Sequence, residues 1–349
     1  MKQFIFVWLI AVCVFSASCG NPEVETIGGI LELSQEELSS LESIPEESAS
    51  EPEQPELEVS EVPSSAPASS AANPASKASV PTANPMQTPP SVPRETYQQT
   101  PVDMSGYIRP SYPADELETL LSLDNTGKSW AHYSNKQGMR PIQSQAIREM
   151  LEKHNGYYIG EDNPKVYLTF DCGYENGYTN IILDTLKAKN VPAAFFITYP
   201  FAKENWQIVE RMLQDGHMVG NHSVTHPNFA NISTEQTLDE IARLDEFIYS
   251  GHGGYKMQYF RFPSGNYSER QLALCKSLGY KSVFWSFAYV DYDEKKQPSA
   301  ATARDTVLSR SHPGAVILLH AISKANAYAL PEIIDGLRAK GFELVPLDF

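Results

Sequence analysis

The stretch TFDCGYENG at residues 169–177 decides the fold of this chain. It continues an apolar, β-branched run that begins at Lys165 and is typical of a buried strand. Asp171 and Cys172 therefore come where a strand gives way to a Gly-containing loop. In α/β proteins this edge of the sheet is where catalytic groups gather, although an Asp in such a turn more often only binds nearby backbone amides.

From Lys165 onwards, strand-like and helix-like segments alternate. Strands are predicted at 165–170, 193–199, 217–221, 258–262, 281–286, 315–319 and 342–346, and helices near 178–189, 204–214, 234–249, 268–278, 301–310 and 325–340. Ser233 and Gln236 fit a capping box at the start of the third helix. The alternation indicates parallel βα units with right-handed crossovers. Because about 185 residues are too few for eight such units, we predict an α/β fold with an incomplete seven-stranded (β/α) barrel.

Residues 1–19 have the pattern of a secretion signal. The apolar run 4–15 follows Lys2 and is too short to span a bilayer as a mature helix. The small residues 16–18 before Cys19 resemble the end of a bacterial lipoprotein signal, so we expect cleavage there and lipidation of Cys19. The alternative is ordinary secretion with cleavage nearby. The lipoprotein interpretation predicts a location on the outer face of the cell membrane, held by a lipid anchor.

Residues 20–100 form an acidic Ser/Pro/Glu-rich linker that we expect to be disordered. The segment has 14 Glu and no Asp against only Lys77 and Arg94, so it carries −12 of the net charge of −16. Such a composition cannot bury enough apolar surface to offset the entropy lost on ordering. As a coil it would reach roughly 50 Å, and fully extended about 250 Å, which suits a tether.

Residues 101–164 are predicted to be a helical extension packed on the main domain, 165–349. One amphipathic stripe contains Leu117, Leu120 and Leu121, and the other contains Ile147, Met150, Leu151 and His154. Outside the signal and Cys19 only Cys172 and Cys275 remain. Two cysteines make no disulfide framework, so the core must hold the fold together.

Polar side chains lie at the carboxyl ends of several predicted strands, which meet on one face of a parallel barrel. They are Asp171 after the first strand, His222 and His226 after the third, Arg261 near the end of the fourth, Asp291 after the fifth, and His320 at the end of the sixth. So many separate polar groups on one rim indicate an active site.

The histidines and the arginine each have a structural alternative. Two histidines four residues apart are often a surface or capping pair, but His222 and His226 could also hold one metal ion, because neutral imidazoles suit zinc. Arg261 could close a surface ion pair. Near Asp171 it would instead keep that carboxylate ionised and oriented.

His320 taken alone is most simply a satisfied core histidine at the end of an apolar strand. Beside Asp291, its pKa would rise and it would serve as a proton donor. Together these interpretations favour a functional site over a set of unrelated structural residues.

The order TFDCG, HSVTH, RFPSG, VDYD and LLH closely resembles the polysaccharide deacetylase family with its NodB-homology domain, over about residues 163–349. The resemblance implies a distorted seven-stranded (β/α) barrel. The segments TFDCGYENG, FWSFAYVD and HNGYYIG are similar to the delta-lactam-biosynthetic de-N-acetylases, which act on N-acetylmuramic acid in peptidoglycan.

The resemblance also implies a role for each polar residue in the metal-assisted hydrolysis of an acetamide. Asp171 matches the catalytic base, Arg261 the residue that orients it, and His320 the general acid. Asp291 matches the acid that tunes this histidine, and His222 and His226 match the metal-binding histidines, with zinc as the expected ion.

The sequence departs from the family pattern at two positions. Cys172 stands where the family has a metal-binding Asp and the delta-lactam branch has Asn, so it is a candidate third ligand. The alternative is a buried thiol that binds no metal. Tyr292 stands where this branch has Trp.

The expected substrate is a cell-wall glycan. Tyr174, Trp285 and Tyr289 are candidates to stack on sugar rings, with a place in the core as the alternative, and Lys324 is a candidate cation for the lactyl carboxylate of muramic acid. N-acetylglucosamine in peptidoglycan or chitooligosaccharide is the alternative target, and a catalytically silent glycan-binding domain is the alternative class. We expect a monomer that does not bind nucleic acid.

Overall fold

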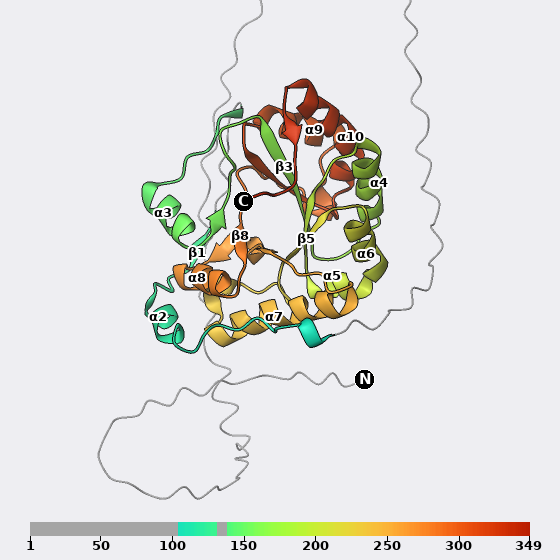
Figure 1. Ribbon diagram of the computed structural model, residues 1–349. Helices are drawn as coiled ribbons and strands as arrows, with labels where there is room; N and C mark the ends of the chain where they lie inside the picture. Colours follow the sequence, from blue (N-terminus) through green and yellow to red (C-terminus); the bar gives the residue numbers. More distant parts are fainter. Residues whose placement is uncertain (1–103, 131–137) are drawn as a thin grey trace, which may run out of the picture. The chain divides into compact units, whose positions relative to one another are not determined.

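The computed structural model describes residues 104–130 and 138–349, and its architecture is a curled parallel sheet surrounded by helices (Figure 1). The predicted signal at 1–19 and linker at 20–100 lie outside the described residues and stay predictions. In the described ranges, no helix has the length and apolar character needed to cross a bilayer.

Strand β3 (Lys165–Cys172) is the centre of the sheet, because it pairs in parallel with three others. The strand order is β10-β3-β4-β5-β6-β8-β2, with β9 pairing the other side of β3. The remaining strands are β2 (Gly156–Tyr157), β4 (Ala194–Ile197), β5 (Met218–Asn221), β6 (Tyr259–Phe260), β8 (Lys281–Val283), β9 (Ala315–His320) and β10 (Glu343–Leu344).

The predicted seven-stranded barrel is confirmed as a distorted, incomplete one. All seven predicted strands are present and parallel. Only a single bridge, Phe287 to Ile317, links β9 to the chain that follows β8. β3 is two residues longer than predicted, so Asp171 lies inside this strand and not after it.

The two faces of β3 carry different sets of side chains, because successive residues of a strand point to opposite sides. Val166, Leu168 and Phe170 belong to the large cluster that includes residues of the helices. Tyr167 belongs to a smaller cluster with Phe196, Val316 and others on the inner face of the curl. Each fully buried Leu or Phe contributes about 1.5–3 kcal/mol to stability, so the outer cluster holds the helices on the sheet.

The predicted helices are all present. They are α4 (Thr179–Lys189), α6 (Trp206–Gln214), α7 (Thr234–Gly251), α8 (Glu269–Ser277), α9 (Ala300–Arg310) and α10 (Lys324–Ala339). An additional short helix, α5 (Tyr199–Glu204), begins where the Thr198 hydroxyl accepts the backbone N–H of Phe201. Capping by Thr198 therefore starts a helix at Tyr199, five residues before the helix that the apolar periodicity predicted near 204–214.

The described part of the N-terminal extension contributes both helices and strands to the main domain. The two predicted amphipathic segments form α2 (Leu117–Ser122) and α3 (Gln145–Lys153). In α2, Leu120 packs on Leu274 of α8, whereas Leu121 is exposed. The sequence pattern did not indicate strand β1 (Lys128–Ser129), which pairs antiparallel with β7 (Asn266–Tyr267), or strand β2, which extends the large sheet.

The capping box predicted for α7 is confirmed. The Ser233 hydroxyl accepts the backbone N–H of Gln236 at 3.2 Å, and the Gln236 side chain accepts the backbone N–H of Ser233 at 2.9 Å. The backbone N–H groups of Ser233 and Gln236, which have no partner within the helix, thereby both gain an acceptor.

Replacing Ser233 with alanine should lower the free energy of unfolding by about 1 kcal/mol, because the N3 amide loses its acceptor. Urea unfolding followed by circular dichroism measures this. Ser309→Ala, which removes an exposed hydroxyl near the end of α9, is the control and should change stability by less than about 0.5 kcal/mol. Equal values for the two variants would show that the capping box contributes nothing.

Candidate active site

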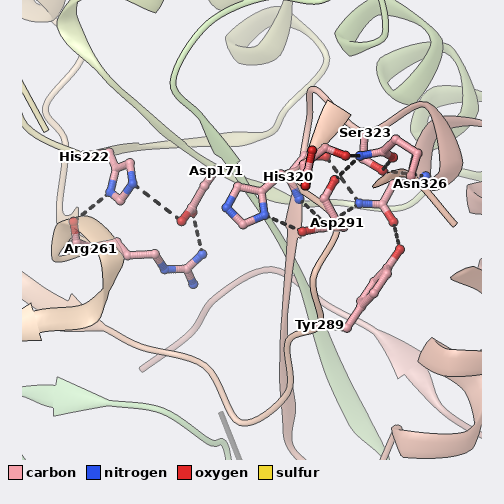
Figure 2. Close-up of polar contacts among 10 residues, drawn as sticks. Asp171, His222, Arg261, Tyr289, Asp291, His320, Ser323 and Asn326 are labelled. Atoms are coloured by element: carbon pink, nitrogen blue, oxygen red, sulfur yellow. Dashed lines mark hydrogen bonds and ion pairs between the residues drawn. The ribbon is translucent and has the colours of Figure 1, made fainter. Parts of the chain in front are cut away.

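The predicted polar residues meet at the carboxyl ends of the strands, and Figure 2 shows all of them except His226. Asp171 of β3 and His320 of β9 are direct partners in the register of these two strands, so their backbones are about 4.8 Å apart. Both line a cavity of about 670 Å³ together with His222 and His226. One cavity therefore holds the predicted base and the predicted acid at neighbouring positions of the sheet.

A buried ion pair fixes the carboxylate of Asp171. Arg261 is fully buried, and its Nη1 donates to Asp171 Oδ1 at 2.8 Å. Its Nε donates to the carbonyl oxygen of Val283 at 2.9 Å and its Nη2 to that of Phe284 at 3.3 Å. Burial alone would raise the pKa of Asp171, but the charge of Arg261 and its hydrogen bond lower it below its ordinary value. The carboxylate is thus held ionised.

His222 is held in a defined tautomer. Its Nδ1 lies 2.8 Å from the carbonyl oxygen of Arg261, and since a carbonyl can only accept, Nδ1 carries the proton. Nε2 therefore keeps its lone pair, 3.6 Å from Asp171 Oδ2. Burial lowers the pKa of His222 to about 4, which keeps the imidazole neutral.

His226 lies on the same loop, with its ring edge-on to that of His222 and the ring centroids 4.9 Å apart. Burial lowers its pKa as well. The loop is held from α7, where the Glu240 carboxylate accepts the backbone N–H groups of Val224 at 2.9 Å and Thr225 at 2.7 Å. These bonds offset the strain of a positive φ of 56° at His226.

His320 and Asp291 form a second charged pair across the cavity wall. The Nδ1–H of His320 donates to Asp291 Oδ1 at 2.6 Å, and its backbone N–H donates to Oδ2 at 2.8 Å. Asp291 is 1% exposed, whereas the His320 side chain reaches the cavity. Burial alone would lower the pKa of His320, but the charge of Asp291 and its hydrogen bond raise it above the ordinary value. The imidazolium is therefore stabilised.

The two histidines fit part of a metal site. His222 offers an oriented, unprotonated Nε2, and the backbone oxygen on its other nitrogen is the kind of support that metal-binding histidines have. His226 lines the same space. Within 104–130 and 138–349, no group of three or more His, Cys, Asp and Glu side chains is placed to hold an ion.

The prediction that Cys172 is a third ligand is wrong on this geometry. Cys172 follows Asp171 in a continuous strand, so its side chain points to the opposite face. It is fully buried in the apolar cluster beneath the helices and does not line the cavity. Burial and the neighbouring charge of Asp171 raise the pKa of its thiol well above the usual value. The alternative of a buried thiol that binds no metal describes this residue.

Of the candidate sugar contacts, two line the cavity and two do not. Tyr174 is 45% exposed at the rim, and Trp285 forms part of the wall. Tyr289 is not part of the lining and donates its hydroxyl to Asn326. Lys324 is exposed at the first turn of α10 and does not line the cavity either. The predictions for Tyr289 and Lys324 are therefore wrong.

Two residues at the site were missed in the sequence. Trp130, directly after β1, lines the cavity and donates Nε1–H to the carbonyl oxygen of Trp285 at 2.9 Å. Asn326 of α10 donates to Asp291 Oδ2 at 2.5 Å. Trp130 comes from the extension, and no periodicity marks it. Asn326 could have been noticed as a polar residue on the apolar face of a predicted helix.

Known proteins are similar to this chain in sequence and in fold. The family model described as polysaccharide deacetylase matches residues 159–283. The peptidoglycan-N-acetylmuramic acid deacetylase PdaA of Bacillus subtilis is 37% identical over 228 residues, which are 65% of this chain and 87% of that protein. A peptidoglycan-N-acetylglucosamine deacetylase of Bacillus cereus is 36% identical over 242 residues, 68% of this chain and 81% of that protein.

A comparison with solved structures also finds a protein with a similar fold. The structure of B. subtilis PdaA, a family 4 carbohydrate esterase, superposes with a TM-score of 0.62 at 37% identity, and covers 63% of this chain and 95% of that one. The sequence, the fold and the arrangement of the polar residues thus all indicate the same family. The chain belongs to the polysaccharide deacetylase family and is a hydrolase of carbon–nitrogen amide bonds, a carbohydrate de-N-acetylase.

Proposed function

We propose that this protein removes the N-acetyl group from an amino sugar of the cell wall, with N-acetylmuramic acid in peptidoglycan as its substrate. The observation that carries the proposal is the presence of two oppositely tuned groups at partner positions of β3 and β9 in one cavity. Asp171 has a lowered pKa and His320 a raised one. At neutral pH this gives a base and an acid side by side, which amide hydrolysis requires.

Asp171 acts as the base. Its Oδ1 is occupied by Arg261, which leaves Oδ2 directed toward the cavity side where His222 lies. The carboxylate accepts a proton from water as the water oxygen attacks the acetyl carbonyl carbon, and a tetrahedral intermediate forms on the substrate. Because Arg261 is fully buried and bonded to two carbonyl oxygens, it keeps the carboxylate in place during the step.

His320 acts as the acid. With Nδ1–H donated to Asp291, its Nε2 is the nitrogen that remains for the substrate. Nε2–H protonates the leaving amine as the carbon–nitrogen bond breaks, which gives acetate and a free amino sugar. The Asp291 carboxylate accepts the Nδ1–H of the ring and stabilises its protonated form before transfer.

His222 and His226 would hold a divalent metal, for which zinc is the expected ion because neutral imidazoles suit it. Such an ion supplies polarisation of the acetyl carbonyl and a lowered pKa of the attacking water. The chain itself contributes the neutral, oriented imidazole of His222 and the fixed loop that carries His226.

The choice of sugar rests on relatives and on the cavity. PdaA, the muramic acid deacetylase, supports N-acetylmuramic acid. One observation favours N-acetylglucosamine instead: among the described residues that line the cavity there is no Lys or Arg to meet a free lactyl carboxylate. The wall has aromatic rings, those of Trp130, Trp285 and Tyr292, which suit sugar faces of either kind.

Asp171→Asn and His320→Ala should each lower the rate of acetate release from purified peptidoglycan by about a hundredfold or more, because each removes one proton-transfer group. Circular dichroism and thermal melts should show an intact fold. Lys324→Ala, an exposed change outside the cavity, is the control and should leave the rate unchanged. Rates close to wild type in either active-site variant would contradict the mechanism, and an inactive wild type would favour a silent glycan-binding domain.

Metal content separates the histidines from the cysteine. Elemental analysis of gel-filtered protein should show zinc in the wild type and in Cys172→Ala, but not in His222→Ala, because the Cys172 side chain lies on the far face of β3. Loss of the ion from Cys172→Ala would restore the cysteine as a ligand. Full occupancy in both variants would place the metal elsewhere in the protein.

Mass spectrometry of enzymatically digested peptidoglycan identifies the sugar. After treatment with the protein, deacetylated muramic acid should appear, in keeping with the similarity to PdaA. Glucosamine without deacetylated muramic acid would reject this substrate and leave the N-acetylglucosamine alternative.

A further inference from the structure

The side chain of Asn326 lies directly behind the His320–Asp291 pair, as Figure 2 shows. It is fully buried in the first turn of α10. Its Nδ2 donates to Asp291 Oδ2 at 2.5 Å and to the backbone carbonyl oxygen of His320 at 3.3 Å. One amide group therefore contacts both members of the pair without reaching the cavity.

The orientation of this amide is fixed from two sides. Its Oδ1 accepts the hydroxyl of Tyr289, so the NH₂ group must face Asp291. Its backbone N–H donates to the hydroxyl of Ser323, the N-cap of α10, at 3.2 Å. Both hydrogens and the oxygen of the amide thus have partners, as a buried polar group requires.

We propose that Asn326 is a positioning residue for His320, acting through Asp291. The inference rests on the proposed role of His320 as the acid. Asp291 Oδ2 has two donors, the backbone N–H of His320 and Nδ2 of Asn326. Together they hold the plane of the carboxylate, which leaves Oδ1 aimed at Nδ1 of His320.

Removing the amide leaves a buried carboxylate with one donor fewer, and a buried charge that lacks a partner reorients toward another. The His320 ring then loses its fixed direction toward the cavity. Because Asn326 does not touch the cavity, substrate binding should stay unchanged while the chemical step slows.

The test uses two variants close to asparagine in size. Asn326→Leu removes both donors, and Asn326→Asp keeps the shape but turns an oxygen toward Asp291. In the metal-loaded, full-length protein, each should lower kcat for acetate release by about ten- to a hundredfold and leave KM within about twofold. In proton NMR spectra, the downfield Nδ1–H signal of His320, identified by its loss in His320→Ala, should disappear or shift. If one variant fails to fold, the other carries the test.

Gln271 provides a matched control. It is a buried amide at the same position of α8, its backbone N–H also donates to an N-cap serine at 3.2 Å, and it does not contact Asp291. Gln271→Leu should keep kcat and the NMR signal.

The outcomes separate the two proposals. A wild-type kcat in Asn326→Leu, a loss of kcat equal to that in Gln271→Leu, or a rise in KM instead of a fall in kcat would overturn the positioning role. Retained activity in His320→Ala would instead overturn the proposed function. The NMR signal tests the contact to Asp291 in either case.

Discussion

The ion pair between Arg261 and Asp171 is the constraint on which the rest of the site depends. Two charges taken out of water are costly, and only good geometry with every remaining donor satisfied makes such a pair tolerable. Each nitrogen of the Arg261 guanidinium has an acceptor, since Nε and Nη2 donate to backbone carbonyl oxygens and Nη1 to Asp171, and the centroid of the Phe196 ring lies 4.0 Å from Cζ. The backbone oxygen of the same arginine sets the tautomer of His222. One residue therefore fixes both the charge of Asp171, the proposed base, and the free nitrogen of the neighbouring imidazole.

His320 and Asp291 form a second supported pair, in which the charges are reversed. At Asp171 a positive neighbour favours the ionised carboxylate, and at His320 a negative neighbour favours the protonated imidazole. Burial acts against the charged form at both positions, so each shift exists only because its partner is held within hydrogen-bond distance. The chemistry is thus a property of two supported pairs and not of two isolated side chains.

The sequence predicted the architecture well because its signals were strong and local. Alternating apolar runs predicted all seven strands of the barrel, and Ser233 with Gln236 predicted the start of α7. The failures have physical causes. The two-residue strands β1 and β2 lie in the N-terminal extension, outside the alternation of strands and helices that indicated the equally short β6 and β10. Cys172 was a candidate third ligand because it stands where the family has a metal-binding Asp and because β3 was predicted to end before it. In fact the strand continues, and its strict alternation turns the thiol away from Asp171.

The site residues also include some that the sequence predicted correctly and some that it misplaced or missed. Groups within short motifs, such as His222 and His226, could be named from sequence. Tyr289 and Lys324 were misplaced because loop paths and helix rotation decide which side chains face the cavity. Trp130 and Asn326 were missed because their function depends on contacts with residues distant in the chain. Such contacts leave no trace in the spacing of motifs, and only the place of Asn326 on the apolar face of a predicted helix was a sign of its role.

The register of β3 and β9 has a consequence for how the protein folds. Asp171 and His320 face each other only when these two strands pair, and almost the whole barrel sequence lies between them. Closing so long a loop costs entropy before the contact is formed, and such non-local pairings are slow. An early compact state with its helices in place would therefore still lack the base and acid side by side. Recovery of activity during refolding would report the docking of β9 on β3, the step that turns a curled sheet into a working enzyme.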